Sequence, residues 1–371
     1  IGWRRSQSSR RFRSTDPSLV IDLSHLFANS APEEICVLRL SAIGDTCHAL
    51  AVIRNLQDNW PDARITWVIG KTEAGLMGDI RDIEFITFDK SRGLRAYRDV
   101  EERLAGRTFD VGLCMHASMR ANLLCRKVPT RVRVGFDKAR ARDFQWLFTD
   151  ERIRAAQGEH ALEAMMGFAR HIGARTTDLR WDIPIDESER SFAAEHVGPR
   201  TVVISPCSSQ RSRNFRNWPV EHFVTVARYL RDRLQANVVL TGGNSPLEKE
   251  YARVIADEAG ATDLVGRTSL RQLFALIAAA DVVICPDYGP AHMATAAGTP
   301  VIGLYATSNP DRTGPYLSRE LCVNRYPDAV ERYLGKRVDD IRWGQRVRHP
   351  DAMALITTSD VTDKIDDFFR F

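Results

Sequence analysis

An alternation of short apolar runs with longer helix-like segments, occurring twice, is the feature of this 371-residue chain that most constrains its fold. The first series runs ICVLRL, RITWVIG, EFITFD and FDVGLCMH, with helix-like segments such as Ala49 to Asn59 and Gly93 to Leu104 between them. The second runs TVVISP, NVVLTGG, ATDLVG, DVVICPD and PVIGLYA. Short buried strands that alternate with helices are typical of parallel sheets. We therefore predict an α/β protein with two doubly wound, Rossmann-like domains that face a central cleft.

The chain is long enough for two domains, and a polar, proline-containing stretch that ends at Arg200 separates the two series. We predict one domain over residues 31–180, a second over residues 200–350, and a tail over residues 351–371 with an amphipathic helix. Ligands of such sheets bind beyond the carboxyl ends of the strands. The site is therefore expected between the two domains.

The first 30 residues open with IGWRRSQSSRRFRS, which holds five arginines and no acidic residue. No apolar segment follows, so a secretory signal is not expected. We expect residues 1–30 to be a disordered basic extension or a misassigned start. A contact with anionic lipid and an organellar transit peptide are the alternatives.

Composition excludes several classes of protein. A formal net charge of +4 with 27% charged residues fits an ordinary soluble protein, and no motif of a nucleic-acid-binding protein occurs. The seven cysteines are scattered without a CxxC pair and the nine histidines do not cluster, so we expect no disulfide framework, no metal site and a reducing, cytoplasmic location. No run approaches the roughly 18 apolar residues that cross a bilayer. The glycine-rich dinucleotide fingerprint and the P-loop motif are also missing from the sequence.

Two segments place polar residues where a strand ends and a helix begins. In LRLSAIGDTCHAL, Asp45 is either a helix cap or a chemical group, and Gly44 would let the turn bring its carboxylate toward the cleft. In DVVICPDYGPAHMATAAGTP, the strand ends at Asp287, and a helix start near Ala291 could hold a phosphate. The alternative for this second segment is that Asp287 caps the helix and His292 is a core histidine.

A third segment, SPCSSQRSRNFRNWP, ends a strand with Ser208 and Ser209 and continues with several arginines, among them Arg216. Hydroxyls and guanidiniums at the carboxyl end of a strand suit a pyrophosphate or another anion. A solvated basic loop is the alternative interpretation.

The order of these segments, with VVLTGGNSPLEKE and VVICPDYGPAHMATAAGTPVIGLYATSNPDRTGPY, closely resembles the ADP-heptose:lipopolysaccharide heptosyltransferases, glycosyltransferase family 9. The resemblance extends from about Ile35 to Tyr316, and we assign no chemistry to the residues beyond it. It implies a GT-B fold, an inverting mechanism, ADP-heptose as the donor substrate and no obligatory metal or other cofactor.

The resemblance also implies roles for single residues. Asp45 matches the general base of the family, and Arg216 stands where the family usually has a donor-contacting lysine. The other positions that it assigns to donor binding are Ser208 and Ser209 at the phosphates, Glu248 at the nucleoside, within one residue, and Asp287, Tyr288, Gly289 and His292 in the donor-binding turn. Tyr288 replaces a small serine or threonine that is common in the family.

For the acceptor we expect the inner core of lipopolysaccharide, drawn to basic residues of the first domain, namely Arg92, Arg95, Arg120 and Arg140. Ordinary solvated arginines are the alternative. Because such an acceptor lies in a membrane, we expect peripheral contact with the cytoplasmic face of the inner membrane, without insertion. Other functions that stay open are a family 9 transferase with another donor or acceptor, a GT-B nucleotide-sugar epimerase and a non-catalytic sugar-nucleotide binding module. The presence of both Asp45 and the Asp287 turn argues against the binding module.

Overall fold

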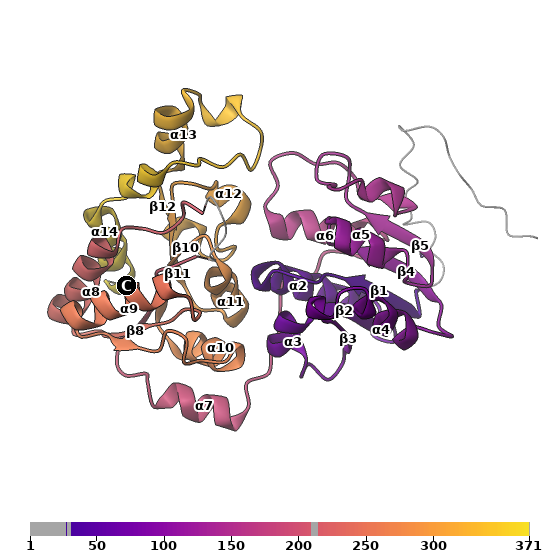
Figure 1. The fold of residues 1–371 in the computed structure, drawn as a ribbon, viewed down its shortest axis with the longest axis horizontal. Helices are drawn as coiled ribbons and strands as arrows, with labels where there is room; N and C mark the ends of the chain where they lie inside the picture. The colour runs from indigo at the N-terminus through magenta and orange to yellow at the C-terminus, as the bar shows by residue number, and fades with distance from the viewer. Residues whose placement is uncertain (1–26, 28–30, 209–213, 371) are drawn as a thin grey trace, which may run out of the picture.

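The computed structural model describes residues 27, 31–208 and 214–370. Almost all of the basic extension, and Ser209 of the third segment, therefore lie outside the described residues. Two parallel six-stranded sheets form two lobes side by side (Figure 1). The prediction of an α/β protein with two Rossmann-like domains is confirmed.

The first sheet has the strand order β3-β2-β1-β4-β5-β6, and every neighbouring pair is parallel. Its strands are β1 (Glu34–Leu38), β2 (Arg64–Gly70), β3 (Glu84–Phe88), β4 (Phe109–Cys114), β5 (Thr130–Gly135) and β6 (Glu151–Arg152). The helices of this domain are α2 (Ile43–Asn59), α3 (Lys71–Met77), α4 (Arg95–Arg103), α5 (Met119–Cys125) and α6 (Ala161–His171), with short 3₁₀ turns η1 (Lys90–Arg92) and η2 (Gln145–Leu147).

The second sheet repeats this topology in the order β12-β11-β10-β7-β8-β9. Its strands are β7 (Thr201–Ile204), β8 (Asn237–Leu240), β9 (Thr262–Asp263), β10 (Val282–Pro286), β11 (Val301–Tyr305) and β12 (Val323–Asn324). The helices are α8 (Val220–Leu234), α9 (Pro246–Ala259), α10 (Leu270–Ala279), α11 (Gly289–Ala297), α12 (Pro310–Thr313), α13 (Tyr326–Leu334) and α14 (Thr358–Phe369), with η3 (Arg319–Leu321), η4 (Val338–Asp340) and η5 (Pro350–Leu355).

In each sheet the strand order reverses between the first and fourth strands of the domain, which are β1 and β4 in one lobe and β7 and β10 in the other. Open sheets of this kind form a crevice for ligands at that reversal. The loops after these four strands are therefore the natural positions for a site. One apolar core continues from α2 and α6 into α10 and α11, so the two lobes share packed surface next to these loops.

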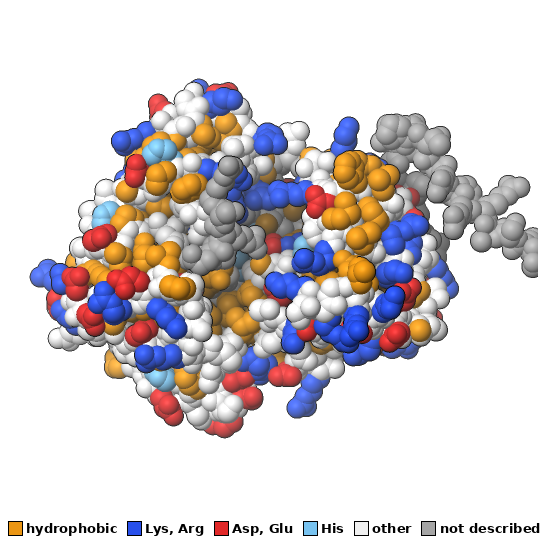
Figure 2. Space-filling view, viewed as in Figure 1, with side chains coloured by type: hydrophobic (Ala, Val, Ile, Leu, Met, Phe, Trp, Pro, Cys, Tyr) orange, Lys and Arg blue, Asp and Glu red, His pale blue; other side chains and the backbone are white. Residues whose placement is uncertain are grey.

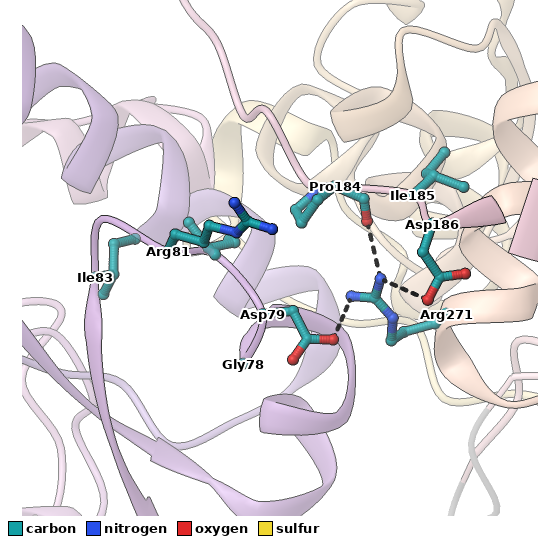
Figure 3. Close-up of a pocket in the computed structure, with 9 residues that line it drawn as sticks. Gly78, Asp79, Arg81, Ile83, Pro184, Ile185, Asp186 and Arg271 are labelled. Atoms are coloured by element: carbon teal, nitrogen blue, oxygen red, sulfur yellow. Dashed lines mark hydrogen bonds and ion pairs between the residues drawn. The ribbon is translucent and has the colours of Figure 1, made fainter. Parts of the chain in front are cut away.

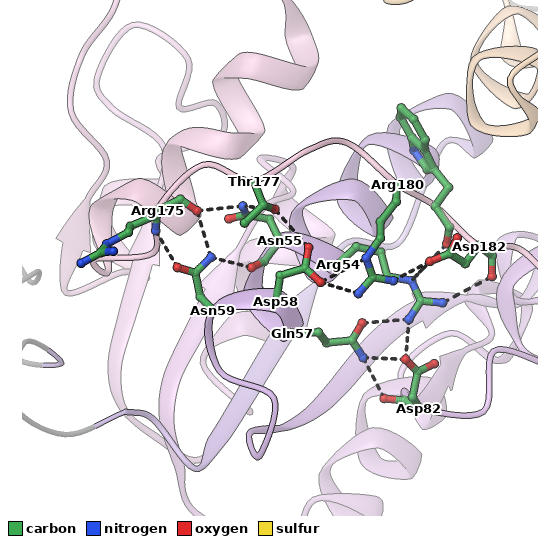
Figure 4. A network of polar contacts seen from close by, with 11 residues as sticks. Arg54, Asn55, Gln57, Asp58, Asn59, Asp82, Arg175, Thr177, Arg180 and Asp182 are labelled. Atoms are coloured by element: carbon green, nitrogen blue, oxygen red, sulfur yellow. Dashed lines mark hydrogen bonds and ion pairs between the residues drawn. The ribbon is translucent and has the colours of Figure 1, made fainter.

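The connection between the lobes is fixed on both sides. Residues 175–182 are bonded to α2, where Arg54 donates from Nε to the Trp181 carbonyl (3.1 Å) and Arg180 pairs with Asp58 (2.6 Å) (Figure 4). The next helix of the connection, α7 (Glu187–Ala194), packs on α10 of the second lobe. The backbone that can bend between these anchors is short, spanning residues 183–186.

A cavity of about 670 Å³ lies beside this short segment, between the end of α3 and the start of α10 (Figure 3). Arg271 of α10 faces it and joins both lobes, because its guanidinium pairs with Asp79 of the first lobe (3.1 Å) and with Glu189 of α7. Arg271 also donates to the Pro184 carbonyl (3.3 Å). We call Arg271, Asp79 and Glu189 the hinge network, because they connect the two lobes beside residues 183–186.

The tail belongs to the second lobe. Helix α14 packs on α8, where the Tyr229 hydroxyl donates to Asp366 (2.5 Å). Trp218 donates its indole N–H to the Ile356 carbonyl (2.9 Å), which fixes the segment before α14. Among the described residues, no helix is both long enough and apolar enough to cross a membrane.

One expectation about the cysteines was wrong. Cys114 at the end of β4 and Cys125 at the end of α5 form a disulfide. The two sulfurs meet because α5 folds back along β4, a tertiary contact that the scattered spacing does not predict. The other five cysteines are free, and four of them are buried.

Candidate active site

Asp45 lies in the first turn of α2, directly after the loop that follows β1. Its carboxylate accepts the backbone N–H of Ala42 (3.3 Å), so it does cap the helix. It also pairs with Arg39, and its side chain keeps 40% of its exposure. The two interpretations of Asp45 are thus compatible, because a capping carboxylate with this exposure can still reach a substrate.

The charge state of Asp45 is set by its surroundings. Burial alone would raise the pKa of its carboxyl, but the Arg39 guanidinium, His292, the Ala42 N–H and His116 together lower that pKa below its ordinary value. Arg39 is itself buried and donates to the Met115 carbonyl (2.5 Å), which fixes its position at the ends of β1 and β4. Asp45 is therefore an ionised, oriented carboxylate at neutral pH.

Facing Asp45 across the domain boundary is the turn between β10 and α11. Asp287 is buried, Tyr288 and Gly289 are half-buried, and His292 lies in the first turns of the helix. A Cβ placed on Gly44 would stand 2.2 Å from His292 Cδ2, and one on Gly289 would stand 3.7 Å from Ile43. The N-terminal ends of α2 and α11 therefore meet at the boundary, and both carry partial positive charge there.

Several buried polar atoms at this meeting point have no hydrogen-bond partner among the described residues. They are Asp287 Oδ2, His292 Nδ1 and Ser308 Oγ. Buried polar atoms are ordinarily paired, and unpaired ones in a cluster need an explanation. A polar ligand between the lobes would supply the missing partners. Ser308 follows β11, the strand beside β10, so all three atoms belong to one edge of the second sheet.

Arg216 joins this cluster from the loop after β7. Its Nη1 donates to the Asp287 carbonyl (2.7 Å) and lies 3.7 Å from Asp287 Oδ2. Asn214 accepts from Arg216 Nε (3.1 Å), which orients the guanidinium. The structure thus brings Arg216 and the Asp287 turn together at the strand-order reversal.

Ser208 and Glu248 have clear roles inside their own loops. Ser208 is fully buried, and its hydroxyl donates to Asn217 (3.0 Å) and accepts from Asn214 (2.7 Å). Glu248 caps α9 and accepts the N–H of Gly243 (2.7 Å) and the hydroxyl of Ser245 (2.5 Å). Both residues therefore shape loops at the edge of the site, and their contact with a donor stays a prediction.

The sequence analysis missed two arginines of the site. Arg346, in the segment to which no chemistry was assigned, lies 3.9 Å from Asp287 Oδ2. Arg312 follows β11, and its pKa is lowered by burial and by the nearby Arg142 and Arg346, against the opposing effects of Asp287 and Asp45. Blue side chains accordingly line the hollow between the two lobes (Figure 2). Arg312 could have been noticed in NPDRTGP, whereas the position of Arg346 depends on tertiary packing alone.

The four arginines expected at the acceptor side do not form one cluster. Arg92 is paired with Asp99 (2.6 Å), and Arg140 is paired with Asp137 and with Glu159 (2.7 Å). Arg95 and Arg120 are exposed at the starts of α4 and α5 and make no ion pair with another described residue. Arg142 of the same stretch lies near enough to Arg312 to help lower the pKa of that guanidinium. The acceptor contacts of the four stay predictions.

Three histidines, of which His48 and His160 are buried, pack together behind the site. The ring of His48 in α2 lies 4.7 Å from that of His292 and 5.6 Å from that of His160 at the start of α6. His160 Nε2 also bonds with the Gly314 carbonyl (2.9 Å) of the second lobe. Burial lowers the pKa of His160 to about 4 and lowers that of His48 well below its usual value, so both rings are neutral at pH 7. No group of His, Cys, Asp and Glu among the described residues has the arrangement of a metal site.

Two parallel-sheet domains with a polar site between them at the strand-order reversals are the architecture of the GT-B fold. The family model for glycosyltransferase family 9 (heptosyltransferase) matches residues 97–336. The chain is 36% identical to the lipopolysaccharide core heptosyltransferase OpsX of Haemophilus influenzae over 337 residues, which cover 89% of this chain and 95% of that protein. The chain belongs to glycosyltransferase family 9, and it is an enzyme of that class.

Solved structures agree with this fold. The family 9 glycosyltransferase from Veillonella parvula superposes with a TM-score of 0.73 at 21% identity, covering 91% of this chain and 97% of that one. The Escherichia coli heptosyltransferase WaaC with ADP gives a TM-score of 0.70 at 19% identity, covering 90% and 99%. These likenesses confirm the GT-B fold.

Proposed function

We propose that this protein is a lipopolysaccharide heptosyltransferase that moves a heptosyl group from ADP-heptose to a sugar hydroxyl of the inner core, with inversion at the anomeric carbon. The observation that carries the proposal is the meeting of α2 and α11, which sets Asp45 of one lobe opposite Asp287 and His292 of the other. Family membership and the relatives that bear this activity support it. The role of Asp45 rests on geometry and resemblance, because the family match begins after α2, at residue 97.

In the proposed reaction the acceptor hydroxyl attacks the anomeric carbon while its proton passes to the Asp45 carboxylate. The bond between that carbon and the diphosphate oxygen breaks, and ADP leaves with the electron pair. A single displacement of this kind inverts the configuration. The guanidiniums of Arg216, Arg312 and Arg346 and the N-terminal end of α11 would stabilise the departing negative charge without a metal ion. Because the two sets of groups come from different lobes, closure of the lobes completes the site.

The location follows from the acceptor. A lipopolysaccharide core sugar is anchored in a membrane leaflet, so the enzyme would work as a peripheral protein on the cytoplasmic face of the inner membrane. The side chain of Arg39 is buried, whereas that of its partner Asp45 keeps 40% of its exposure. Such an acceptor can therefore reach the Asp45 carboxylate.

The test is release of ADP from ADP-heptose by the purified protein, with and without a heptose-deficient core acceptor, with the product mass measured. We expect acceptor-dependent ADP release and a product heavier by one heptose. In Asp45→Ala and Asp45→Asn the rate should fall by about 10²- to 10⁴-fold, the usual contribution of a general base. Asp62→Ala, which removes an exposed aspartate outside the site, is the matched control and should keep full activity.

Other results would contradict the proposal in distinct ways. Donor turnover without acceptor would indicate an epimerase or a hydrolase. Transfer that persists in both Asp45 variants would remove Asp45 as the base. Tight ADP binding without any transfer would indicate another acceptor or a binding role.

A further inference from the structure

The first lobe carries a compact group of exposed apolar side chains. Nine large hydrophobic residues of the described chain are exposed. Five of them lie on α5 and in residues 143–147, which we call the η2 segment. We call these five the apolar patch; they are Met119 (41% exposed), Leu123 (47%), Phe144 (57%), Trp146 (40%) and Leu147 (67%). Orange side chains gather on this lobe with blue ones around them (Figure 2). A clustered apolar surface of this kind marks an interaction site.

Hydrogen bonds of the surrounding backbone and side chains hold the patch in its exposed position. Asn122 donates from Nδ2 to the Asp143 carbonyl (2.8 Å), and the Asp143 carboxylate accepts the N–H of Met119 (2.8 Å), so α5 and the η2 segment form one unit. Gln145 is buried and donates to the Cys114 carbonyl (2.9 Å). A buried amide between exposed Phe144 and exposed Trp146 reverses the ordinary distribution of polar and apolar residues.

The backbone supports the same conclusion. Asp143 and Phe144 both have positive φ, at 51° and 56°. A bulky residue rarely adopts this left-handed conformation, which costs free energy and is kept where the surrounding structure enforces it. Here it turns the Phe144 ring outward, beside Trp146, with 5.4 Å between the ring centroids.

Unpaired positive charge surrounds the patch. Arg120 of α5, Arg126 directly after α5, and Arg142 just before the η2 segment are exposed and form no ion pair with any described residue. Many other arginines of the chain are paired, as Arg92, Arg140 and Arg180 show. Exposed aromatic and aliphatic side chains ringed by arginines complement an anionic lipid surface, where the cations meet headgroups and the apolar groups enter the interface.

The patch also lies at the edge of the site. Helix α5 begins just after His116, whose Nδ1 accepts the N–H of Leu40 (3.3 Å) at the end of β1, close to Asp45. Arg142 lies near enough to Arg312 to affect its pKa, and the charges of Asp287 and Asp45 also act on Arg312. A membrane against α5 and η2 would therefore bring a lipid-anchored sugar to the opening between the lobes.

We propose that the apolar patch docks this protein on an anionic phospholipid bilayer, with Phe144, Trp146 and Leu147 inserted among the headgroups. The biological purpose of this docking rests on the proposed function. The proposal differs from the sequence-based expectation of contact without insertion. The surface is specific to the first lobe, so the cleft has a fixed orientation toward the membrane.

The test is flotation of the full chain with vesicles of phosphatidylcholine alone or of phosphatidylcholine with phosphatidylglycerol. We expect binding to the anionic vesicles, weakened about tenfold or more in Trp146→Ser/Leu147→Ser through lost apolar burial. Arg126→Glu should also weaken binding at low salt, since one cation near the surface contributes about a fivefold difference. Leu247→Ser, which removes an exposed leucine of the second lobe, is the matched control and should bind like the wild type.

Equal binding of the Trp146→Ser/Leu147→Ser variant and the wild type would overturn the proposal, and so would no binding of the wild type to anionic vesicles. A wild-type dimer that this variant dissociates in sedimentation experiments would assign the patch to a second copy of the chain instead. Thermal melts establish that the variant is folded.

Activity separates this inference from the proposed function. We expect the Trp146→Ser/Leu147→Ser variant to match the wild type on a deacylated, water-soluble core acceptor and to be slower on an acceptor embedded in vesicles. The wild type could bind vesicles through the patch and yet transfer heptose to neither acceptor. That result would support the docking surface and contradict the proposed function.

Discussion

At the scale of single residues, the ion pair between Arg39 and Asp45 decides how the proposed base behaves. Arg39 is buried and held by the Met115 carbonyl, so its charge stays beside the carboxylate. The pKa of Asp45 is lowered because this charge and its polar neighbours outweigh burial. A lowered pKa makes the base weaker but keeps it deprotonated over the whole working range of pH.

The pH dependence of kcat/KM tests this balance. Since the base acts in its deprotonated form, activity should be lost on the acid side only as pH falls through the lowered pKa of Asp45. Arg39→Gln removes the cation but leaves Asp45 as buried as before. The pKa of Asp45 should therefore rise, and the acid limb of the kcat/KM profile should move to higher pH. Arg39→Lys keeps the charge and should move the limb less. An unchanged acid limb in Arg39→Gln would mean that another group controls it.

At the scale of elements, the approach of α2 to α11 explains why a glycine precedes Asp45. Gly44 was expected to free the turn, but the structure gives a different reason. A Cβ at this position would collide with the ring of His292, at 2.2 Å from Cδ2 and 2.9 Å from Cγ. The Nδ1 atom of that ring is buried and the ring packs against His48, with 4.7 Å between the ring centroids, so it has little room to move away. The helix starts at Ile43, two residues before Asp45, in agreement with a helix start expected at this aspartate.

Gly44→Ala is therefore expected to push α2 away from α11. Overpacking of this kind costs about 1 to 3 kcal/mol of unfolding free energy, and a displaced base lowers kcat/KM by about 10²-fold. Urea unfolding and steady-state kinetics measure the two effects. Gly75→Ala in α3 is the control, because nothing lies within 4 Å of its added Cβ. It should stabilise the helix by up to about 1 kcal/mol and leave kinetics alone. Wild-type kinetics in Gly44→Ala would show that the helices do not meet this closely in solution.

At the scale of the whole molecule, the sequence predicts the architecture because eight strands are apolar runs. A ninth strand, β9, is short and polar but lies in the predicted segment ATDLVG. Strand β5 was missed, since Arg131 and Arg133 alternate with valines and only its last two residues are buried. Strands β6 and β12 have two residues each, too few for a pattern. The site could be predicted where it follows the central strands, at Asp45, Arg216 and Asp287. Arg346 could not, because its approach to Asp287 depends on how the segment between α13 and η5 folds back.

The last prediction concerns the hinge network and the orientation of the two lobes. Arg271 pairs with exposed Asp79 in the first lobe and with buried Glu189 in α7 of the connecting segment. Asp79→Asn should change the unfolding free energy by less than about 1 kcal/mol, as for other exposed pairs, yet raise KM because the closed arrangement loses a contact. In Glu189→Gln the half-buried guanidinium of Arg271 is poorly paired, so the free energy of unfolding should fall by about 3 kcal/mol. Denaturant unfolding, kinetics and X-ray scattering of the two variants separate orientation from stability. An Asp79→Asn variant with wild-type KM and scattering would show that this pair does not hold the lobes.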